Sequence, residues 1–203
     1  MDRVTIKERA RFLLSTYRGP SVGVYLLFTA LSAVVGGVTF GFAALVLLPP
    51  LQVGVCIFFL GAWRAQQPPV ESLFYGFRQY LQSLIALLWA GLLTFLWSLV
   101  FIIPGIVRAL AYSLTPYLVA EYPNLEPRRA VELSMAITDG HKAEILVMFL
   151  SFLGWLLLSG LTFGILHVAY VGPYMQLSFA GLYESLLADA LDRGVVTEAD
   201  LIV

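Results

Sequence analysis

Long apolar stretches, separated by short polar segments, dominate the pattern along the chain. Four blocks stand out, at residues 21–63, 81–103, 106–120 and 143–187. A membrane-spanning helix needs about 20 residues, so the first and last blocks are each long enough for two. Glycine-containing turns at 36–41 and 160–164 divide these blocks, and Pro104-Gly105 joins the middle two. The pattern predicts an all-α polytopic membrane protein with six transmembrane helices, at 21–36, 42–63, 81–103, 106–120, 143–160 and 165–187.

Three amphipathic segments lie between or before these helices, at 3–18, 68–81 and 124–139. In the first, Ile6, Ala10 and Leu13 share one face, and basic residues recur at every fourth position on another. This arrangement favours a helix on an anionic inner leaflet. In all three segments, the simpler interpretation is a connector that lies on the bilayer.

The placement of basic residues predicts the topology. If both termini are cytoplasmic, all of the 12 Lys and Arg residues except Arg108 fall on the cytoplasmic side, and the outer turns carry no charge. This is the positive-inside pattern. We therefore expect a multi-pass protein of a bacterial cytoplasmic (inner) membrane, with both termini in the cytoplasm. The hydrophobic run beyond residue 33 continues to Leu48, so the first span is expected to be retained rather than cleaved as a signal peptide.

The predicted helices group into three hairpin units, 1–63, 64–121 and 122–187. Each returning helix contains proline, at Pro49-Pro50, Pro116 and Pro173, and "TFG" precedes the proline in the first and third units. The pattern suggests a triplicated hairpin in one membrane domain, 1–187, although glycine and proline are also common in unrelated membrane helices. Residues 188–203 form an acidic C-terminal tail, which we expect to extend the last helix and then become mobile.

Composition supports a membrane protein and excludes several other classes. Hydrophobic residues make up 60% of the chain, charged residues 12%, and the mean hydropathy is +0.86. A soluble domain has about 25% charged residues. The formal net charge of −1 provides no basic field for nucleic acid. Cys56 is the single cysteine, so neither a disulfide nor a cysteine-based metal site can form within the chain.

Three stretches resemble a bacterial family of uncharacterised integral membrane proteins, catalogued as domain of unknown function nine-seven-five. They are "LFYGFRQY" (73–80), "LWSLVFIIPGIVRALAYSLTPYLVAEYPNLEPRRAVELSMAITDGHK" (96–142) and "LSFLGWLLLSGLTFGILHVAYVGPYMQLSFAGLYE" (150–184). More distantly, the pattern is similar to the membrane domain of some glycerophosphodiester phosphodiesterases. The resemblance implies a polytopic inner-membrane protein and carries no catalytic residues.

The usual signatures of catalysis are missing from the sequence. There is no glycine-rich phosphate loop and no His-Glu-x-x-His motif, and the two histidines, His141 and His167, lie far apart. We therefore predict no enzymatic activity, no cofactor and no metal site.

Arg108 follows Pro104-Gly105 within an apolar run. Three residues past a turn, it would lie about 4.5 Å deep, from where it could reach the lipid phosphates. His167 also follows its turn glycine by three residues, and Tyr112 and Tyr170 lie one helical turn beyond. The sharper hypothesis is an anion or lipid-headgroup site at the outer leaflet, made by Arg108, His167, Tyr112 and Tyr170.

Polar residues cluster in sequence near the three prolines. Broken helices often line transporter sites. Gln52, Thr115, Tyr117, Tyr174 and Gln176 are the candidates for a polar interior. The alternative is that the prolines only shape helix packing.

Two functions remain open on the sequence. The leading one is a non-enzymatic inner-membrane protein that organises or regulates membrane partners. The alternative is a carrier or channel for a small solute or lipid, with the anion site near Arg108. The expected partners are the bilayer and its anionic phospholipids, and a partner protein or a second copy of the chain is compatible with either function.

Overall fold

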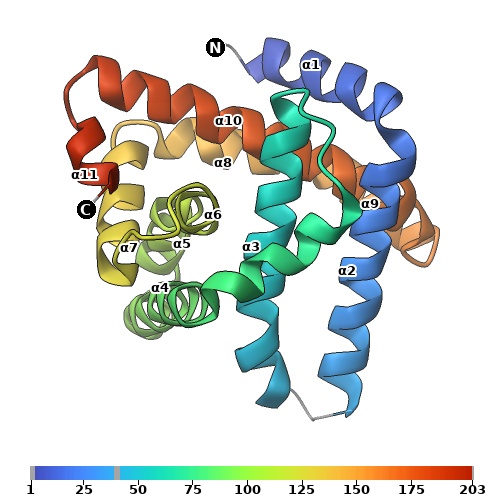
Figure 1. Cartoon of the computed structure of the whole chain (residues 1–203), viewed down its shortest axis with the longest axis horizontal. Helices are drawn as coiled ribbons and strands as arrows, with labels where there is room; N and C mark the ends of the chain where they lie inside the picture. The colour runs from blue at the N-terminus through green and yellow to red at the C-terminus, as the bar shows by residue number, and fades with distance from the viewer. Residues whose placement is uncertain (1–2, 39–41, 203) are drawn as a thin grey trace.

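The computed structural model describes residues 3–38 and 42–202, and these residues form helices without a strand (Figure 1). The helices in chain order are α1 (Arg3–Thr16), α2 (Arg18–Val38), α3 (Phe42–Trp63), the 3-10 helix η1 (Val70–Gln79), α4 (Tyr80–Val100), α5 (Ile102–Ala111), α6 (Thr115–Glu121), α7 (Pro127–Thr138), α8 (Lys142–Leu150), α9 (Leu153–Leu161), the π-helical turn η2 (His167–Val171), α10 (Gly172–Asp192) and α11 (Glu198–Ile202). The predicted all-α fold is confirmed.

Within residues 3–38 and 42–202, five stretches are long and apolar enough to cross a membrane. They are Arg18–Gly37, Ala43–Trp63, Val70–Leu99, Ile102–Glu121 and Lys142–Leu161, and they correspond to the first five predicted helices. The sixth, 165–187, falls on η2 and α10 and is not among these stretches. The count of six spans stays a prediction.

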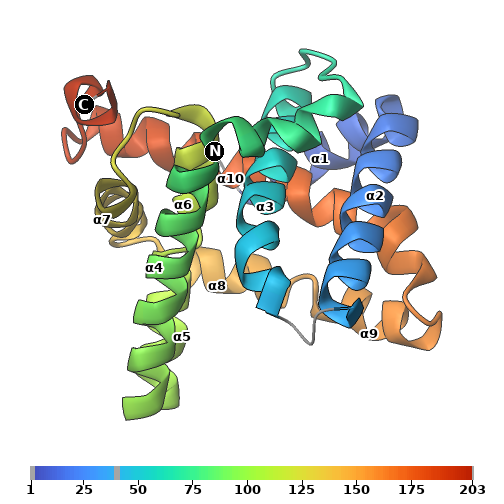
Figure 2. The same ribbon diagram turned by 60° about the horizontal axis from the view of Figure 1, so that its bottom comes forward.

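Apolar side chains cover much of the outer surface. At the α4–α5 turn, Phe95, Leu99, Phe101, Ile102 and Ile103 are all more than 60% exposed. Soluble monomers rarely expose a contiguous apolar patch of this kind. Figure 2 shows the α4–α5 hairpin projecting beyond the other helices. The surface is therefore that of a helical membrane protein.

The helix pairs do not run parallel to one another. Figure 1 looks nearly along α4 and α5, whereas α2 and α3 lie across the view and α10 crosses them. The pairs meet at α3, which contacts α2, η1, α4, α6 and α10. Val53, Cys56, Phe58 and Phe59 of α3 are buried at this junction.

Charged connections gather on one side of the molecule. In Figure 2, the α4–α5 turn and the facing ends of α2 and α3 point downward, whereas the connections at 64–69 and 122–126 and helix α11 lie at the top. We call the upper side, with residues 64–69 and 121–129, the charged end, and the side of the α4–α5 turn the apolar end.

The middle hairpin turns three residues earlier than the sequence pattern predicts. Phe101 is extended, with φ −156° and ψ 145°, and α5 begins at Ile102. Pro104 then lies in the first helical turn, where its missing N–H breaks no hydrogen bond. Gly105 packs closely on Ser98, since a Cβ there would come 2.3 Å from the Ser98 Oγ. Arg108 follows the actual turn by seven residues, about 10 Å of helix rise instead of the expected 4.5 Å.

One of the three proline positions coincides with a helix break. The chain leaves α5 at Ala111 and re-enters a helix at Thr115, immediately before Pro116, whereas the π-helical turn η2 continues directly into α10 at Gly172-Pro173. Helix α3 also runs through Pro49-Pro50 without a break. The turn at 160–164 is present, with Phe163 and Gly164 at positive φ, whereas the matching "TFG" at 39–41 lies outside the described residues. The hairpin repeat therefore stays a prediction.

The three amphipathic segments pack on the protein. In α1, the predicted face is buried through Ile6, Ala10, Leu13 and Leu14, and this helix contacts α10. The segment 68–81 forms η1, which packs on α3, and α7 packs on α4 and α6. The helical character of 3–18 and 124–139 is confirmed. Protein neighbours cover the apolar faces of α1 and α7, whereas Phe74 of η1 is 49% exposed. That these segments lie on the bilayer stays a prediction.

The C-terminal tail is docked on the protein. As predicted, α10 extends beyond residue 187, to Asp192. The residues after it do not become a free end: Val196 and Leu201 are buried, and Arg129 Nη2 donates to Asp200 Oδ1 at 2.5 Å. The short helix α11 is therefore held against α7.

The crossing of η1 over α3 depends on two glycines, so we expect Gly54→Ala to destabilise the protein severely. A Cβ on Gly54 would lie 1.7 Å from the Leu73 carbonyl oxygen, and one on Gly76 would lie 1.9 Å from the Pro50 carbonyl oxygen. Backbone atoms cannot move aside as a side chain does, so the expected loss is about 3 kcal/mol or more. Thermal unfolding of the purified protein measures it. Gly23→Ala, with no atom within 4 Å, is the control and should leave stability unchanged or raise it. Equal melting temperatures for both variants would contradict this packing.

We expect acid pH to release α11. Hydrogen bonds from the Thr197 hydroxyl and backbone N–H, and then from Arg129, hold the pKa of Asp200 below its usual value of 3.8. Because the folded pKa is depressed, this contribution to docking is present above the ordinary pKa and is lost as pH falls through the folded pKa. The hydrogen-exchange protection factors of residues 197–202, which correct for the intrinsic pH dependence of exchange, should therefore fall below about pH 4. Asp200→Asn should lower the same protection factors at neutral pH, and Asp192→Asn, a change in α10, should not. Protection factors that depend on neither pH nor Asp200 would exclude this role.

Candidate functional site

An ionic network at the charged end joins the ends of α3 and α6 to α10. Arg64 follows α3 directly, Glu121 ends α6, and Glu184 lies in α10. Arg64 Nη2 lies 2.5 Å from Glu121 Oε1, and Arg64 Nε lies 2.5 Å from Glu184 Oε1. The guanidinium group thus donates hydrogen bonds to two carboxylates at once, as the planar arrangement of its N–H groups allows.

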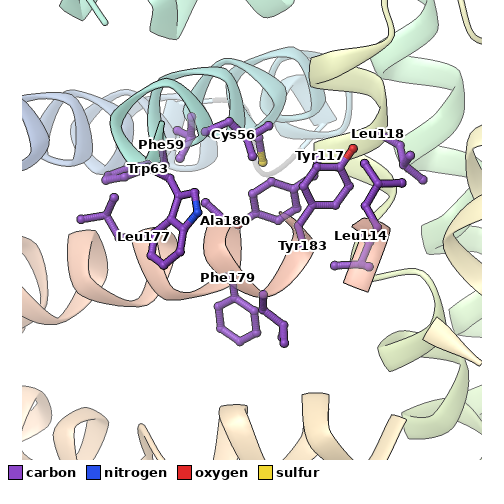
Figure 3. Close-up of a cluster of buried hydrophobic side chains, with 14 of the residues drawn as sticks. Cys56, Phe59, Trp63, Leu114, Tyr117, Leu118, Leu177, Phe179, Ala180 and Tyr183 are labelled. Atoms are coloured by element: carbon purple, nitrogen blue, oxygen red, sulfur yellow. The ribbon is translucent and has the colours of Figure 1, made fainter. Parts of the chain in front are cut away.

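Tyr183 connects this network to the hydrophobic core. Its hydroxyl donates to Glu121 Oε2 at 2.6 Å. Its ring stacks on the Tyr117 ring, with centroids 5.5 Å apart and an interplanar angle of 19° (Figure 3). Both tyrosines are buried. The carboxylate of Glu121 therefore accepts from two donors, one at the surface and one from the core.

The electrostatics favour a permanently charged arginine. Burial alone would lower the pKa of Arg64, but hydrogen bonds to Glu121 and Glu184 outweigh it and raise the pKa. Burial, and next the charge of Glu121, raise the pKa of the neighbouring Tyr122. Arg64 therefore keeps its charge across the physiological range.

A groove of about 510 Å³ opens beside the network. Its walls come from α1, the end of α3 and α10, and its lining is Arg9, Trp63, Arg64, Gly181, Glu184, Ser185, Ala188, Asp189 and Asp192. Gly181 lets α10 approach α3, because a Cβ there would lie 2.3 Å from the Trp63 ring. Arg9 lies over the same ring at 4.6 Å and donates to the Trp63 carbonyl.

Three of the five candidates for a polar interior lie together. Gln52 and Tyr117 both reach the buried thiol of Cys56, and the Tyr117 hydroxyl donates to Gln176 Oε1 at 3.3 Å (Figure 3). Thr115 is fully buried nearby in sequence, and its hydroxyl lacks a hydrogen-bond partner among the described residues.

Tyr174 belongs to a different environment. Its ring packs edge-on against Phe152, with centroids 5.2 Å apart, and Arg11 of α1 lies over its other side at 5.5 Å. It therefore contributes to the packing of α1 on α10.

The four residues of the predicted outer anion site do not form one site, because Arg108 and His167 contact different neighbours. Arg108 Nη1 donates to the Met135 sulfur at 3.2 Å, and its guanidinium lies 4.7 Å from the Trp97 ring centroid. Tyr112 is buried in a small cluster with Ala90, Ala111 and Val131.

His167 has its own partner. Its Nε2 lies 2.8 Å from the Tyr25 hydroxyl of α2, and Tyr170 packs on Trp155. The contacts of the described residues do not join Arg108 to His167. The cation–π contact and the sulfur acceptor explain how Arg108 is accommodated deeper than expected.

The residues of the ionic network were not among the sequence candidates. Arg64 counted only as a cytoplasmic charge, and Glu121 as the end of an apolar run. One signal was available: Glu184 is the single acidic residue in the predicted helix 165–187, and an ionisable residue in such a helix indicates a partner. Within residues 3–38 and 42–202, no group of three or more His, Cys, Asp and Glu is placed to hold a metal ion.

Comparison with known proteins gave one family match, which lies within the second half of the chain. Residues 102–190 match the model of the family described as "Protein of unknown function (DUF975)". The resemblance to this domain of unknown function, drawn from the sequence stretches, is confirmed over those residues. Searches of curated proteins and of solved structures returned no match. The more distant similarity to glycerophosphodiester phosphodiesterases stays a prediction.

We expect the ionic network to stabilise the junction of α3, α6 and α10. Glu121→Gln should reduce the free energy of unfolding by about 1–3 kcal/mol, because it removes the negative charge and leaves one acceptor oxygen for two donors, Arg64 and Tyr183. In a double-mutant cycle with Tyr183→Phe, the coupling energy should exceed about 0.5 kcal/mol. Thermal and denaturant unfolding in one detergent provide both values. Asp139→Asn, which breaks the exposed pair with Lys142, is the control and should cost little. Additive losses in the cycle would contradict a shared network.

Proposed function

We propose that the protein is a non-enzymatic integral membrane protein that organises or regulates membrane partners. It lies in the bacterial cytoplasmic membrane as a multi-pass protein, with the charged end and both termini in the cytoplasm. The gathering of the basic connections at the charged end supports this orientation through the positive-inside rule. A strongly tilted α10 would complete an even number of crossings.

The Arg64 network carries this proposal. It fastens α3, α6 and α10 together at one end of the molecule. A carrier that alternates between two access states rocks its repeats against each other, and each cycle would have to break these two contacts. A scaffold benefits from the same contacts, because they keep the groove beside Arg64 in one shape. That groove opens at the charged end, where cytoplasmic segments of partner proteins are within reach.

A second candidate, a carrier or channel for a small solute or lipid, is supported by a different observation. A helix break precedes Thr115, a π-helical turn precedes Gly172, and the buried hydroxyl of Thr115 lacks a partner among the described residues. Polar groups at helix breaks are typical of transport sites. The hypothesis of an anion site near Arg108 belongs to this candidate. In the structure, the guanidinium already contacts the Trp97 ring and the Met135 sulfur.

Two measurements on the same preparation separate these functions. Photo-crosslinking in cells, with a benzophenone side chain at Ala188 in the groove, should give discrete protein adducts. The same probe at Leu99, on the exposed apolar hairpin, should give no such adducts. In proteoliposomes, release of a trapped anion and scrambling of a labelled phospholipid should not exceed the rates of empty liposomes. Flux that falls in Arg108→Ala would overturn the scaffold in favour of the carrier.

A further inference from the structure

A second cavity, of about 730 Å³, opens at the charged end where η1 runs into α4. Five elements contribute to its wall: α3, η1, α4, α6 and the connection at 122–126. It shares no lining residue with the groove beside Arg64. It is therefore a separate site, and the function proposed above does not depend on it.

The cavity carries one positive charge and no negative one. Arg78 is the charged residue of its lining, and no carboxylate faces it there. The guanidinium lies 4.3 Å from the Tyr75 ring centroid. Arg78 is in none of the ion pairs of residues 3–38 and 42–202. An arginine fork without a carboxylate, backed by an aromatic ring, is suited to a phosphate group.

The polar residues around Arg78 add hydrogen-bonding capacity. The side-chain Oε1 of Gln79 is buried and has no partner among the described residues. A buried acceptor of this kind costs free energy until a donor reaches it. Asn124 also lines the cavity and presents a second amide. A ligand with a hydroxyl or ammonium group close to its phosphate would donate to an amide oxygen while its phosphate contacts Arg78.

The remaining walls are apolar and lie next to the membrane-spanning part of the chain. Ile57, Leu81 and Ala120 line the cavity, and all three belong to candidate spans. The span that includes η1 runs from Val70 to Leu99, 30 residues. A crossing needs about 20, so η1 lies at the level of the lipid headgroups. An anionic head with an apolar tail therefore matches the cavity better than a soluble ion does.

Internal hydrogen bonds hold the walls in place. The Gln82 amide donates to the backbone carbonyls of Tyr122, at 3.4 Å, and Leu125, which fastens the connection at 122–126 to α4. The Ser83 hydroxyl donates to the Gly76 carbonyl at 3.3 Å and fastens η1 to the same helix. The cavity is thus formed before a ligand arrives, which lowers the ordering cost of binding.

From these observations we infer that the cavity between η1, α4 and the connection at 122–126 binds the headgroup of an anionic glycerophospholipid of the inner leaflet. The phosphate lies against Arg78, a hydroxyl of the headgroup donates to the Gln79 amide, and the acyl chains run along Ile57, Leu81 and Ala120.

Native mass spectrometry of the full-length protein in detergent, titrated with phosphatidylglycerol, tests the inference. Arg78→Gln should weaken binding of the first lipid about tenfold, because it removes a charge-assisted contact. Arg128→Gln is the matched control. It also removes an arginine that lies over an aromatic ring, Trp89 at 5.3 Å, but Arg128 does not line the cavity. Ala120→Leu fills the cavity without changing any charge, and it should weaken binding as well. Thermal unfolding of each variant confirms that it is folded.

The outcomes separate the inference from its alternatives. Loss of phosphatidylglycerol binding in Arg78→Gln and Ala120→Leu, with binding kept in Arg128→Gln, supports it. Equal losses in both arginine variants would show diffuse surface attraction and overturn it. Competition by sn-glycerol 3-phosphate at the affinity of the lipid would assign the cavity to a soluble phosphate ester. If phosphatidylcholine bound as tightly as phosphatidylglycerol, the net negative charge of the lipid would play no part in binding, and the inference of an anionic-lipid site would be overturned.

Discussion

The contact of one arginine with two glutamates fixes how α3, α6 and α10 meet at the charged end. Arg64, Glu121 and Glu184 come from distant parts of the chain, and the guanidinium with its two acceptors links all three elements in one place. In a membrane, apolar helix faces gain little by choosing one partner over another, because lipid tails are equally apolar. Polar contacts then select the arrangement. The stacking of Tyr117 on Tyr183 continues that selection into the core (Figure 3).

Features that depend on local sequence were predictable. The apolar blocks identified the first five membrane-crossing stretches, and the spacing of Ile6, Ala10 and Leu13 identified the buried face of α1. The turn of the middle hairpin was misplaced because Pro104-Gly105 is also acceptable in the first turn of a helix. Phe101, which makes the actual turn, has no turn propensity of its own. The partner of each amphipathic face was not predictable either, since periodicity shows that a face is apolar and does not show whether lipid or protein covers it.

The same distinction between local sequence and tertiary packing applies to the candidate site residues. Gln52, Tyr117 and Gln176 were grouped because each lies near a proline in its hairpin, and the structure brings these three together around Cys56. Arg108 and His167 were grouped by an assumed repeat, and each has its own neighbours. Glu121 and Glu184 were not grouped at all, because their association depends on the mutual orientation of α6 and α10. No spacing in the sequence encodes that orientation.

The close crossing of Gly54 and Gly76 has a consequence for the order of assembly. Both glycines lie in the first 80 residues, so η1 can settle on α3 while the rest of the chain is still being synthesised. Contacts between residues near in sequence form quickly. At that stage Arg64 already stands at the end of α3, but Glu121 and Glu184 have yet to be made. Glu121 balances this charge once α6 is made, and the second carboxylate arrives only with α10. The arginine thus distinguishes a finished molecule from an incomplete one: until α10 is in place, the guanidinium lacks one of its two acceptors.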